Sequence, residues 1–513
     1  MTAVQHRVRQ SQWVLIWRQF RRRRLAVAAA VVIALLFGVS IFAPLIAHDR
    51  PLYYVGSNRF DYQEAARTLR ALLGQISSES QAGRRAELLK SARLQWELMA
   101  VELPVDDAAK LREFGARATA AASTPDAAGL RKLQIELRKD FSRGDLKLRE
   151  TARWPVLASL GGMDLFFMTG YVVCLAAPLG FWGVSRLAPV GRQHALRRGL
   201  TAAVFAVPVL AAVGWWWFVP QRLDRTNYKL AVLAADPAAA TAPVVFQQVL
   251  WPPIPFAIDE DDLSRKAAPP YWALKEPAKS PSSPWNGPHW LGTDDLGRDI
   301  LCRMIWGGRV SLAVGVVAVS IYTFIGIIVG AVAGYFRGFW DLVISRIIEV
   351  VICFPAFFLI LTIVAFFGPG LMNIMIIIGL TGWTGIARLV RGEFLRLVDQ
   401  EFVLAGKALG YSAPHIIFRH VLPNALAPVL VSATFGVAGA ILTESSLSFL
   451  GLGISVPTPS WGSILSSGRD AIFRAPWLIQ FPGLAIFITI TCYNLVGEAL
   501  RDASDPRLRG SRA

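Results

Sequence analysis

The residue types best suited to chemistry gather in one short segment of the chain. These residues are His289, Asp294, Asp295 and Asp299. Such a set suits metal ligation or acid–base catalysis. However, its spacing matches neither a calcium-binding loop nor a zinc motif, and Arg298 lies among the acids. We therefore predict a structural loop here and no metal site.

The same segment also predicts the start of a helix. Thr293-Asp294-Asp295 offers capping side chains, and the run Ile300–Trp306 follows it. We expect a capped helix at the membrane interface that leads into an apolar span.

The sequence lacks the motifs of a self-contained ATPase or hydrolase. No GxxxxGK[ST] phosphate-binding loop occurs, since Gly406-Lys407 is followed by Ala408 and Glu401 stands where the first glycine is required. Neither a Gly-x-Ser-x-Gly elbow nor an HExxH pair is present. We expect no enzymatic activity and no cofactor in this chain.

One segment without catalytic residues carries a clear pattern of helix and turn residues. Residues 401–423 read EFVLAGKALGYSAPHIIFRHVLP. Gly410 suits the left-handed position that ends a helix, and Pro414 suits the first turn of the next helix. We predict a helix that ends at Gly410, a turn through Ser412 and Pro414, and a second short helix closed by Pro423. Such a segment forms a rigid docking surface, and the alternative is a solvated amphipathic connector.

This segment resembles the EAA loop of ABC-importer permeases, whose pattern is Glu-Ala-Ala, three residues, Gly, nine residues and Ile-x-Leu-Pro. Two positions depart from the pattern at its start, because Leu404 replaces the Glu and Gly406 replaces the second Ala. His420 also replaces the common Ile. The resemblance implies that the loop inserts a coupling helix into a groove on an ATPase subunit. The residues assigned to this coupling site are Glu401, Ala405, Gly406, Gly410, His420, Leu422 and Pro423.

Three further stretches resemble the dipeptide/oligopeptide/nickel type of these permeases. They are residues 289–312, 444–462 and 494–509. The similarity covers about residues 285–510, together with the first apolar span and its basic start. It leaves out most of residues 50–250, where this chain carries an insertion.

The elements around these motifs are runs of about 20 apolar residues, long enough to cross a bilayer as helices. The chain of 513 residues is 54% hydrophobic and only 17% charged, which excludes a purely soluble enzyme and a disordered chain. We predict an all-α, polytopic membrane protein, and the resemblance implies that its core is a type I ABC-importer permease. The eight expected spans are residues 25–47, 162–184, 200–219, 310–334, 347–367, 371–390, 425–447 and 481–500.

The net charge of +17 would suggest nucleic-acid binding in a soluble protein. In this chain the basic residues are concentrated in the loops between the expected spans. An inside amino terminus places 21 of them in the loops of one face and only two in the short loops of the other. This asymmetry predicts that both termini are cytoplasmic, and we expect no nucleic-acid partner.

Two long segments are expected outside the cytoplasm. Residues 48–161 carry helix-forming residues at helical spacing and predict an amphipathic hairpin or small bundle. Residues 220–309 are rich in proline and predict an extended, ordered cap. The expected organisation is a cytoplasmic basic segment (1–24), a first span (25–47), the helical insertion (48–161), two additional spans (162–219), the Pro-rich segment (220–309), a core of five spans with the coupling loop (310–500) and a cytoplasmic tail (501–513).

Three residues inside expected spans are candidates for a translocation pathway. Pro355 is expected to kink its span, as suits a helix that lines a pathway. Glu444 and Ser445 lie near the outer end of a later span. Two roles are open for Glu444, which either caps the exit of the pathway or hydrogen-bonds to the 448–462 loop.

The resemblance implies a permease subunit of an ATP-driven ABC importer in the bacterial inner membrane, translocating a peptide or related small solute. It also implies as partners a second homologous permease, two cytoplasmic ABC ATPases and an extracytoplasmic solute-binding protein. Two other functions stay open. One is a membrane-embedded enzyme that uses Asp294, Asp295 and His289 at the outer surface. The other is a sensor whose input domain is residues 50–160.

Overall fold

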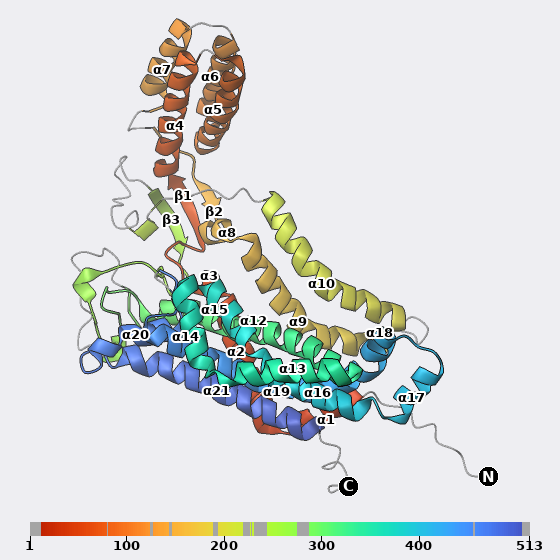
Figure 1. The fold of residues 1–513 in the computed structure, drawn as a ribbon. Coiled ribbons are helices and arrows are strands. Elements are labelled where there is room, and N and C mark those ends of the chain that lie inside the picture. The colour runs from red at the N-terminus through yellow and green to blue at the C-terminus, as the bar shows by residue number, and fades with distance from the viewer. Residues whose placement is uncertain are drawn as a thin grey trace. The chain divides into compact units, whose positions relative to one another are not determined.

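The chain is mostly helical in the computed structural model (Figure 1). Contacts divide it into two compact units. The core unit comprises residues 1–43, 258–276 and 288–513, and the inserted unit comprises residues 44–257 and 277–287. The structure describes residues 12–79, 81–123, 127–142, 146–187, 193–218, 226, 228–229, 244–273, 287–454 and 457–504.

The described residues contain seven helical stretches that are long and apolar enough to cross a membrane, and one bent helix pair makes an eighth. The prediction of an all-α membrane protein with about eight spans is confirmed. The core unit holds α1 (Gln12–Arg21), α2 (Arg24–Ile41), η2 (Leu263–Arg265), η3 (Tyr271–Ala273), α12 (Ile300–Phe336), α13 (Gly338–Cys353), α14 (Ala356–Phe367), α15 (Leu371–Thr381), α16 (Trp383–Leu397), α17 (Glu401–Ala408), α18 (Ala413–Ile416), η4 (Ile417–Val421), α19 (Leu422–Phe449), α20 (Trp461–Ser467), η5 (Arg469–Ala471) and α21 (Trp477–Ser504).

The longest helix, α12, packs closely against α16 along a row of glycines. Gly326, Gly330 and Gly334 lie four residues apart on α12 and face α16. A Cβ atom on Gly330 would lie only 2.5 Å from the carbonyl oxygen of Ala387. Small residues let membrane helices approach closely, so that dispersion contacts stabilise the pair where the lipid supplies no hydrophobic drive.

Helix α12 begins ten residues earlier than the predicted span, at Ile300. Its N-cap is Asp299, whose carboxylate accepts a hydrogen bond of 2.7 Å from the backbone N–H of Cys302. The expected helix at Ile300 does lead into the span, but its cap is Asp299 and not the predicted Thr293-Asp294-Asp295. Because no residue breaks the helix after Ile300, the interfacial turn and the span form one helix of 37 residues.

The next span is bent where Pro355 was expected to kink it. Helices α13 and α14 meet at an angle of 82°. Phe354 is extended, with φ −85° and ψ 124°, as the residue before a proline prefers. The predicted kink is confirmed, and it is sharp enough to make this stretch a broken span or a re-entrant segment.

The inserted unit contains a bundle of four helices. Helix α4 packs against α5 and α7, and α6 packs against the same two helices. Apolar residues at helical spacing, such as Leu69, Leu73 and Ile76 on α4, form its buried core with Trp96 and Phe114. The elements of the unit are α3 (Ala43–Ile46), β1 (Tyr53–Asn58), α4 (Arg59–Ser78), α5 (Ala82–Glu102), α6 (Val105–Ser123), α7 (Ala127–Asp140), β2 (Thr151–Arg153), α8 (Pro155–Ser159), α9 (Gly162–Leu187), α10 (Gln193–Phe218) and β3 (Val244–Leu250).

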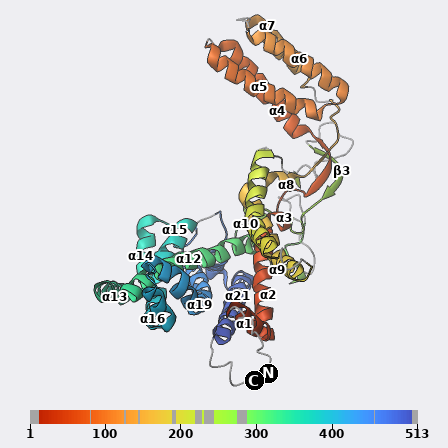
Figure 2. The same cartoon turned by 90° about the vertical axis from the view of Figure 1, so that its right-hand side faces the viewer.

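A small antiparallel sheet, which the sequence analysis did not predict, joins the parts of the inserted unit. Its strand order is β2-β1-β3, so the first strand pairs with both later ones. The apolar helices α9 and α10 form a hairpin between β2 and β3, and Figure 2 shows the two helices side by side. Strand β3 lies in the predicted Pro-rich segment 220–309, of which residues 220–225, 227, 230–243 and 274–286 are outside the described residues.

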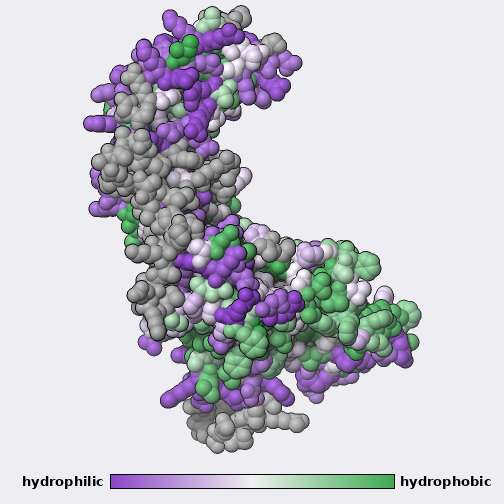
Figure 3. Space-filling model, turned by 90° about the vertical axis from the view of Figure 1, so that its left-hand side faces the viewer, coloured by the Kyte–Doolittle hydropathy of each residue, from purple (hydrophilic) through white to green (hydrophobic). Residues whose placement is uncertain are grey.

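Surface hydropathy separates the bundle from the membrane helices. Hydrophilic residues cover much of the α4–α7 bundle in Figure 3, whereas hydrophobic residues gather over the spanning helices of the core unit. Exposed apolar side chains of the core unit, such as Phe324, Phe366 and Phe367, have the distribution expected of a lipid-facing surface.

The contact between α12 and α16 predicts opposite effects for two glycine substitutions. In Gly330→Ala the new methyl group meets the backbone of α16, and overpacking of this kind costs about 1–3 kcal/mol. In the matched control Gly392→Ala the methyl group meets nothing within 4 Å. We expect a lower thermal unfolding midpoint in detergent for Gly330→Ala and an equal or higher one for Gly392→Ala. A Gly330→Ala protein as stable as the parent would contradict the close packing.

Candidate functional site

Residues 401–423 form two short helical segments joined by a tight turn. Helix α17 ends at Ala408, and Gly410 adopts the left-handed conformation with φ +77°. The N–H of Tyr411 donates to the carbonyl of Gly406 at 3.1 Å, and the N–H of Gly410 donates to that of Lys407 at 3.0 Å. This pair of bonds is a Schellman motif, which fixes the direction in which the chain leaves α17.

The second segment differs from the prediction, because Pro423 does not close it. Helix α18 starts near Pro414, as expected, but passes through a π-helical turn at η4 directly into the long helix α19. Pro423 has no N–H to donate, and the N–H of Leu422 bonds to the carbonyl of Ile417, five residues earlier. The loop is thus continuous with a membrane-spanning helix.

The loop has a small buried interior and an apolar outer surface. Val403, Gly406, Ile416 and Val421 are buried. A Cβ atom on Gly406 would meet Tyr411 and Ile416 at ordinary van der Waals distances, so the loop has room for the family's alanine. The apolar side chains that remain exposed are Phe402, Leu404, Leu409, Tyr411 and Phe418.

The predicted coupling residues lie on both sides of this interior. Glu401 is exposed in the first turn of α17, and Ala405 is also exposed. His420 is half-buried, and its ring lies 5.6 Å from that of His415 and 6.0 Å from that of Tyr411. Leu422 and Pro423 occupy the first turn of α19.

One ion pair joins the segment directly before the loop to the end of α12. The Arg337 guanidinium donates to the Asp399 carboxylate at 2.7 Å and to the carbonyl of Leu395 at 3.1 Å. The hydrogen bond from Arg337 keeps the pKa of Asp399 below its usual value. Lys407 of α17 also lies over the ring of Tyr335, 5.8 Å from its centre. These contacts connect the start of the loop to the turn between α12 and α13.

Sequence analysis missed Arg337 and Asp399 because they are 62 residues apart in the chain. The sequence did contain one local sign of a turn at this position, because Arg337 directly precedes Gly338 at the end of a span. Arg337 adopts φ +55°, an unfavourable conformation for a residue with a Cβ atom. Strained residues of this kind persist where the surrounding contacts fix them, often at functional positions.

The candidate pathway residues lie in different places. Glu444 is fully buried and accepts hydrogen bonds from Ser311 of α12 at 3.1 Å and from Ser448 at 2.8 Å. Ser445 is buried beside it, and Ser311 accepts a bond of 3.2 Å from the N–H of Trp461. Of the two roles considered for Glu444, these contacts favour bonding to neighbouring segments. Pro355 lies at the bend between α13 and α14 and is not part of this cluster.

The carboxylates considered for chemistry are held by structural contacts. Asp299 caps α12 and lies 2.8 Å from Nδ1 of His289. Asp294 accepts a 2.7 Å bond from Nε of Arg298, and Asp295 is exposed. No three metal-ligating side chains converge in the part of the chain that the structure describes. This arrangement supports the structural loop that was predicted.

Comparisons with known proteins identify the family. Residues 326–510 match the model of the binding-protein-dependent transport system inner membrane component, and residues 11–65 match the N-terminal TM domain of oligopeptide transport permease C. The dipeptide transport system permease protein DppC of Alkalihalophilus pseudofirmus is 44% identical over 45% of this chain and 77% of the relative. The chain belongs to this family of transport permeases.

Other relatives of this permease show the same coverage. The oligopeptide transport system permease protein OppC of Bacillus subtilis is 42% identical over 43% of the permease and 72% of the relative. The glutathione transport system permease protein GsiD of Escherichia coli is 43% identical over 44% and 75%. Among solved structures, an inward-facing conformation of the MetNI methionine ABC transporter covers 40% of the permease and 97% of that chain, with 17% identity and a TM-score of 0.34, and adds nothing to the assignment.

The Arg337–Asp399 pair leads to a prediction about backbone hydrogen exchange in the permease. In Arg337→Ala the segment directly before the loop loses its bonds to the end of α12, so we expect faster hydrogen exchange of the backbone amides in residues 399–410. The control is Arg346→Ala, which removes an exposed i,i+3 pair with Glu349 on α13. Hydrogen exchange measured by mass spectrometry distinguishes the two variants. Equal exchange in Arg337→Ala and the parent would show that the pair does not hold the loop.

Proposed function

We propose that this permease is a subunit of an ATP-driven importer that translocates a peptide or a related small solute. Support comes from its family and from relatives whose names specify dipeptide, oligopeptide and glutathione transport. A solute-binding protein delivers the solute, and a second homologous permease completes the pathway. Two ABC ATPases supply the energy, because the sequence contains no phosphate-binding loop of its own.

The proposal rests on the structure of the loop 401–423, which presents exposed apolar side chains on a fixed turn. Its turn is fixed by the Schellman motif, and its buried residues keep the two segments together. Leu409 and Phe418 nevertheless remain 70% and 68% exposed. Apolar side chains presented on a rigid turn at the end of a membrane helix are typical of a docking surface. We assign the ATPase as the partner that covers them.

The proposed orientation places both termini and this loop in the cytoplasm. The distribution of basic residues supports this, with 21 against two in the loops of the two faces. The core unit is compatible with it, because Arg23 at the start of α2 forms an ion pair with Asp502 at the end of α21. Eight spans, counting the bent pair once, return the chain to the face on which it started.

The proposed mechanism is alternating access driven by movement of the loop. ATP-driven closure of the ATPases displaces α17 and α18, and the continuous helix α18–η4–α19 carries the displacement into the membrane. The Arg337–Asp399 pair transmits it to the α12–α13 turn. The bend at Pro355 lets α14 reorient, whereas the buried Glu444 and Ser445 keep the outer ends of α12 and α19 together. The free energy of ATP binding thereby shifts the equilibrium between two arrangements of the membrane helices.

The conformation of Gly410 provides the test. A β-branched residue in the left-handed region costs ~1–2 kcal/mol or more, whereas asparagine visits that region readily. A Cβ atom at Gly410 would meet nothing within 4 Å, so both side chains have room and only the backbone preference differs. We expect Gly410→Val to insert in the membrane but to lose co-purification with the ATPase and solute uptake, and Gly410→Asn to retain both.

The readouts are pull-down of a tagged candidate ABC ATPase from the same organism and uptake of labelled peptides into proteoliposomes that hold the assembled importer. ATPase binding by Gly410→Val at the parent level would refute the docking role of the loop. Uptake that fails for every peptide while ATPase binding persists would instead refute the proposed solute class.

A further inference from the structure

The turn between helices α1 and α2 carries five arginines, all of them exposed. They are Arg18, Arg21, Arg22, Arg23 and Arg24. The chain contains no acidic residue before Asp49, so neither helix supplies a carboxylate to this turn. One carboxylate comes from the end of α21, where Asp502 pairs with Arg23. Residues 501–513 hold four arginines and two aspartates, so the carboxyl-terminal segment also carries net positive charge.

Buried apolar side chains fix helix α1, which lies beside α2 and α21 (Figure 2). Ile16 and Phe20 are one helical turn apart on α1, and both are buried. Phe20 packs with Ala499 of α21. Trp17, by contrast, is 60% exposed and lies one turn before Arg21, so these two side chains share the outward face of the helix. Helix α1 is thus amphipathic, and its exposed face combines an aromatic ring with positive charge.

The exposed face of α2 places this turn at the edge of the membrane. Helix α2 is long and apolar enough to span a bilayer, and four of its exposed apolar side chains fall on one face, as suits contact with lipid acyl chains. They are Leu25, Val31, Leu35 and Val39. Because Arg24 directly precedes Leu25, the arginines lie where the hydrocarbon ends and the lipid headgroups begin. Tryptophan side chains such as Trp17 favour the same depth.

We propose that the α1–α2 turn binds the headgroups of anionic phospholipids, with Arg18, Arg21 and Arg22 donating to their phosphate groups. A guanidinium donates two parallel hydrogen bonds to a phosphate. Each basic residue beside an anionic membrane surface strengthens binding by about fivefold. Trp17 adds an amphipathic ring at the interface, and Arg23 positions the turn through its pair with Asp502. The inference concerns the amino-terminal helices alone and does not depend on the transport function.

The test compares the full-length permease in nanodiscs of phosphatidylcholine, which has no net charge, and in nanodiscs that also contain anionic phosphatidylglycerol. Mass spectrometry follows hydrogen exchange of the backbone amides in residues 16–24. We expect phosphatidylglycerol to slow this exchange by about fivefold or more, and added salt to reverse the effect. Soluble glycerol phosphate should have no effect in neutral nanodiscs. Arginines that act only on the orientation of insertion would leave exchange equal in both nanodiscs. Equal exchange, or slowing by the soluble anion, overturns the proposal.

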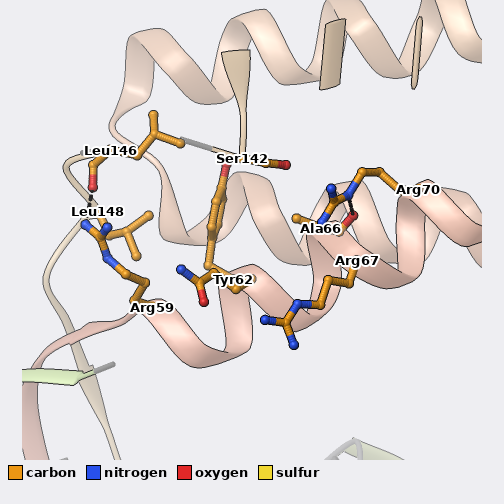
Figure 4. Close-up of a pocket in the computed structure, with 9 residues that line it drawn as sticks. Arg59, Tyr62, Ala66, Arg67, Arg70, Ser142, Leu146 and Leu148 are labelled. Atoms are coloured by element: carbon orange, nitrogen blue, oxygen red, sulfur yellow. Dashed lines mark hydrogen bonds between the residues drawn. The ribbon is translucent and has the colours of Figure 1, made fainter. Parts of the chain in front are cut away.

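The decisive variant is Arg21→Gln with Arg22→Gln, which removes two charges from the turn. We expect phosphatidylglycerol to slow its exchange by less than about twofold, whereas Arg21→Lys with Arg22→Lys keeps most of the effect. The control is Arg67→Gln with Arg70→Gln on α4, a helix that is not apolar enough to span a membrane (Figure 4). Full slowing in the decisive variant, or an equal loss in the control, contradicts the proposal. If the decisive variant fails to insert, the lipid and salt dependence of the parent decides.

Discussion

The close approach of α12 and α16 is the contact on which the core unit depends. Helices in lipid gain little from hydrophobic association, so their pairing rests on dispersion between surfaces that fit. The glycines of α12 admit the backbone of α16 to a distance that no larger side chain allows. This fixes α12 as a rod of about 55 Å at ~1.5 Å per residue, with buried polar contacts at one end and the loop at the other.

Helix α12 and the neighbouring α13–α14 pair differ in stiffness. Helix α12 has no proline, and its N-terminal third is held to α19 through the hydrogen bond between Ser311 and Glu444. The α13–α14 pair is broken at Pro355, where backbone bonds are missing. The Arg337–Asp399 pair therefore lies at the turn between a straight helix and a helix pair that is broken at a proline. The hinged pair is the element that can change packing without disrupting the core.

Local residue preferences made much of this structure predictable. The spans follow from apolar length, the bend from Pro355, and the turn of the loop from Gly410, because each effect acts within a few residues. The apolar span was predicted to begin at residue 310, ten residues after the start of α12, because the charged side chains of Arg303 and Arg309 lower the hydropathy of its first turns. The sheet and the Arg337–Asp399 pair depend on residues brought together from distant parts of the chain, and hydropathy and local motifs carry no information on such pairings.

The inserted unit is organised so that the chain enters and leaves it at neighbouring points. Ala47 forms a bridge with Ile254, and the N–H of Ile254 donates to the carbonyl of Ile46 at 3.0 Å. Strand β1 lies centrally and pairs with β2 after the bundle and with β3 after the α9–α10 hairpin. A unit with adjacent ends can be added to a protein without separating the segments on either side of it.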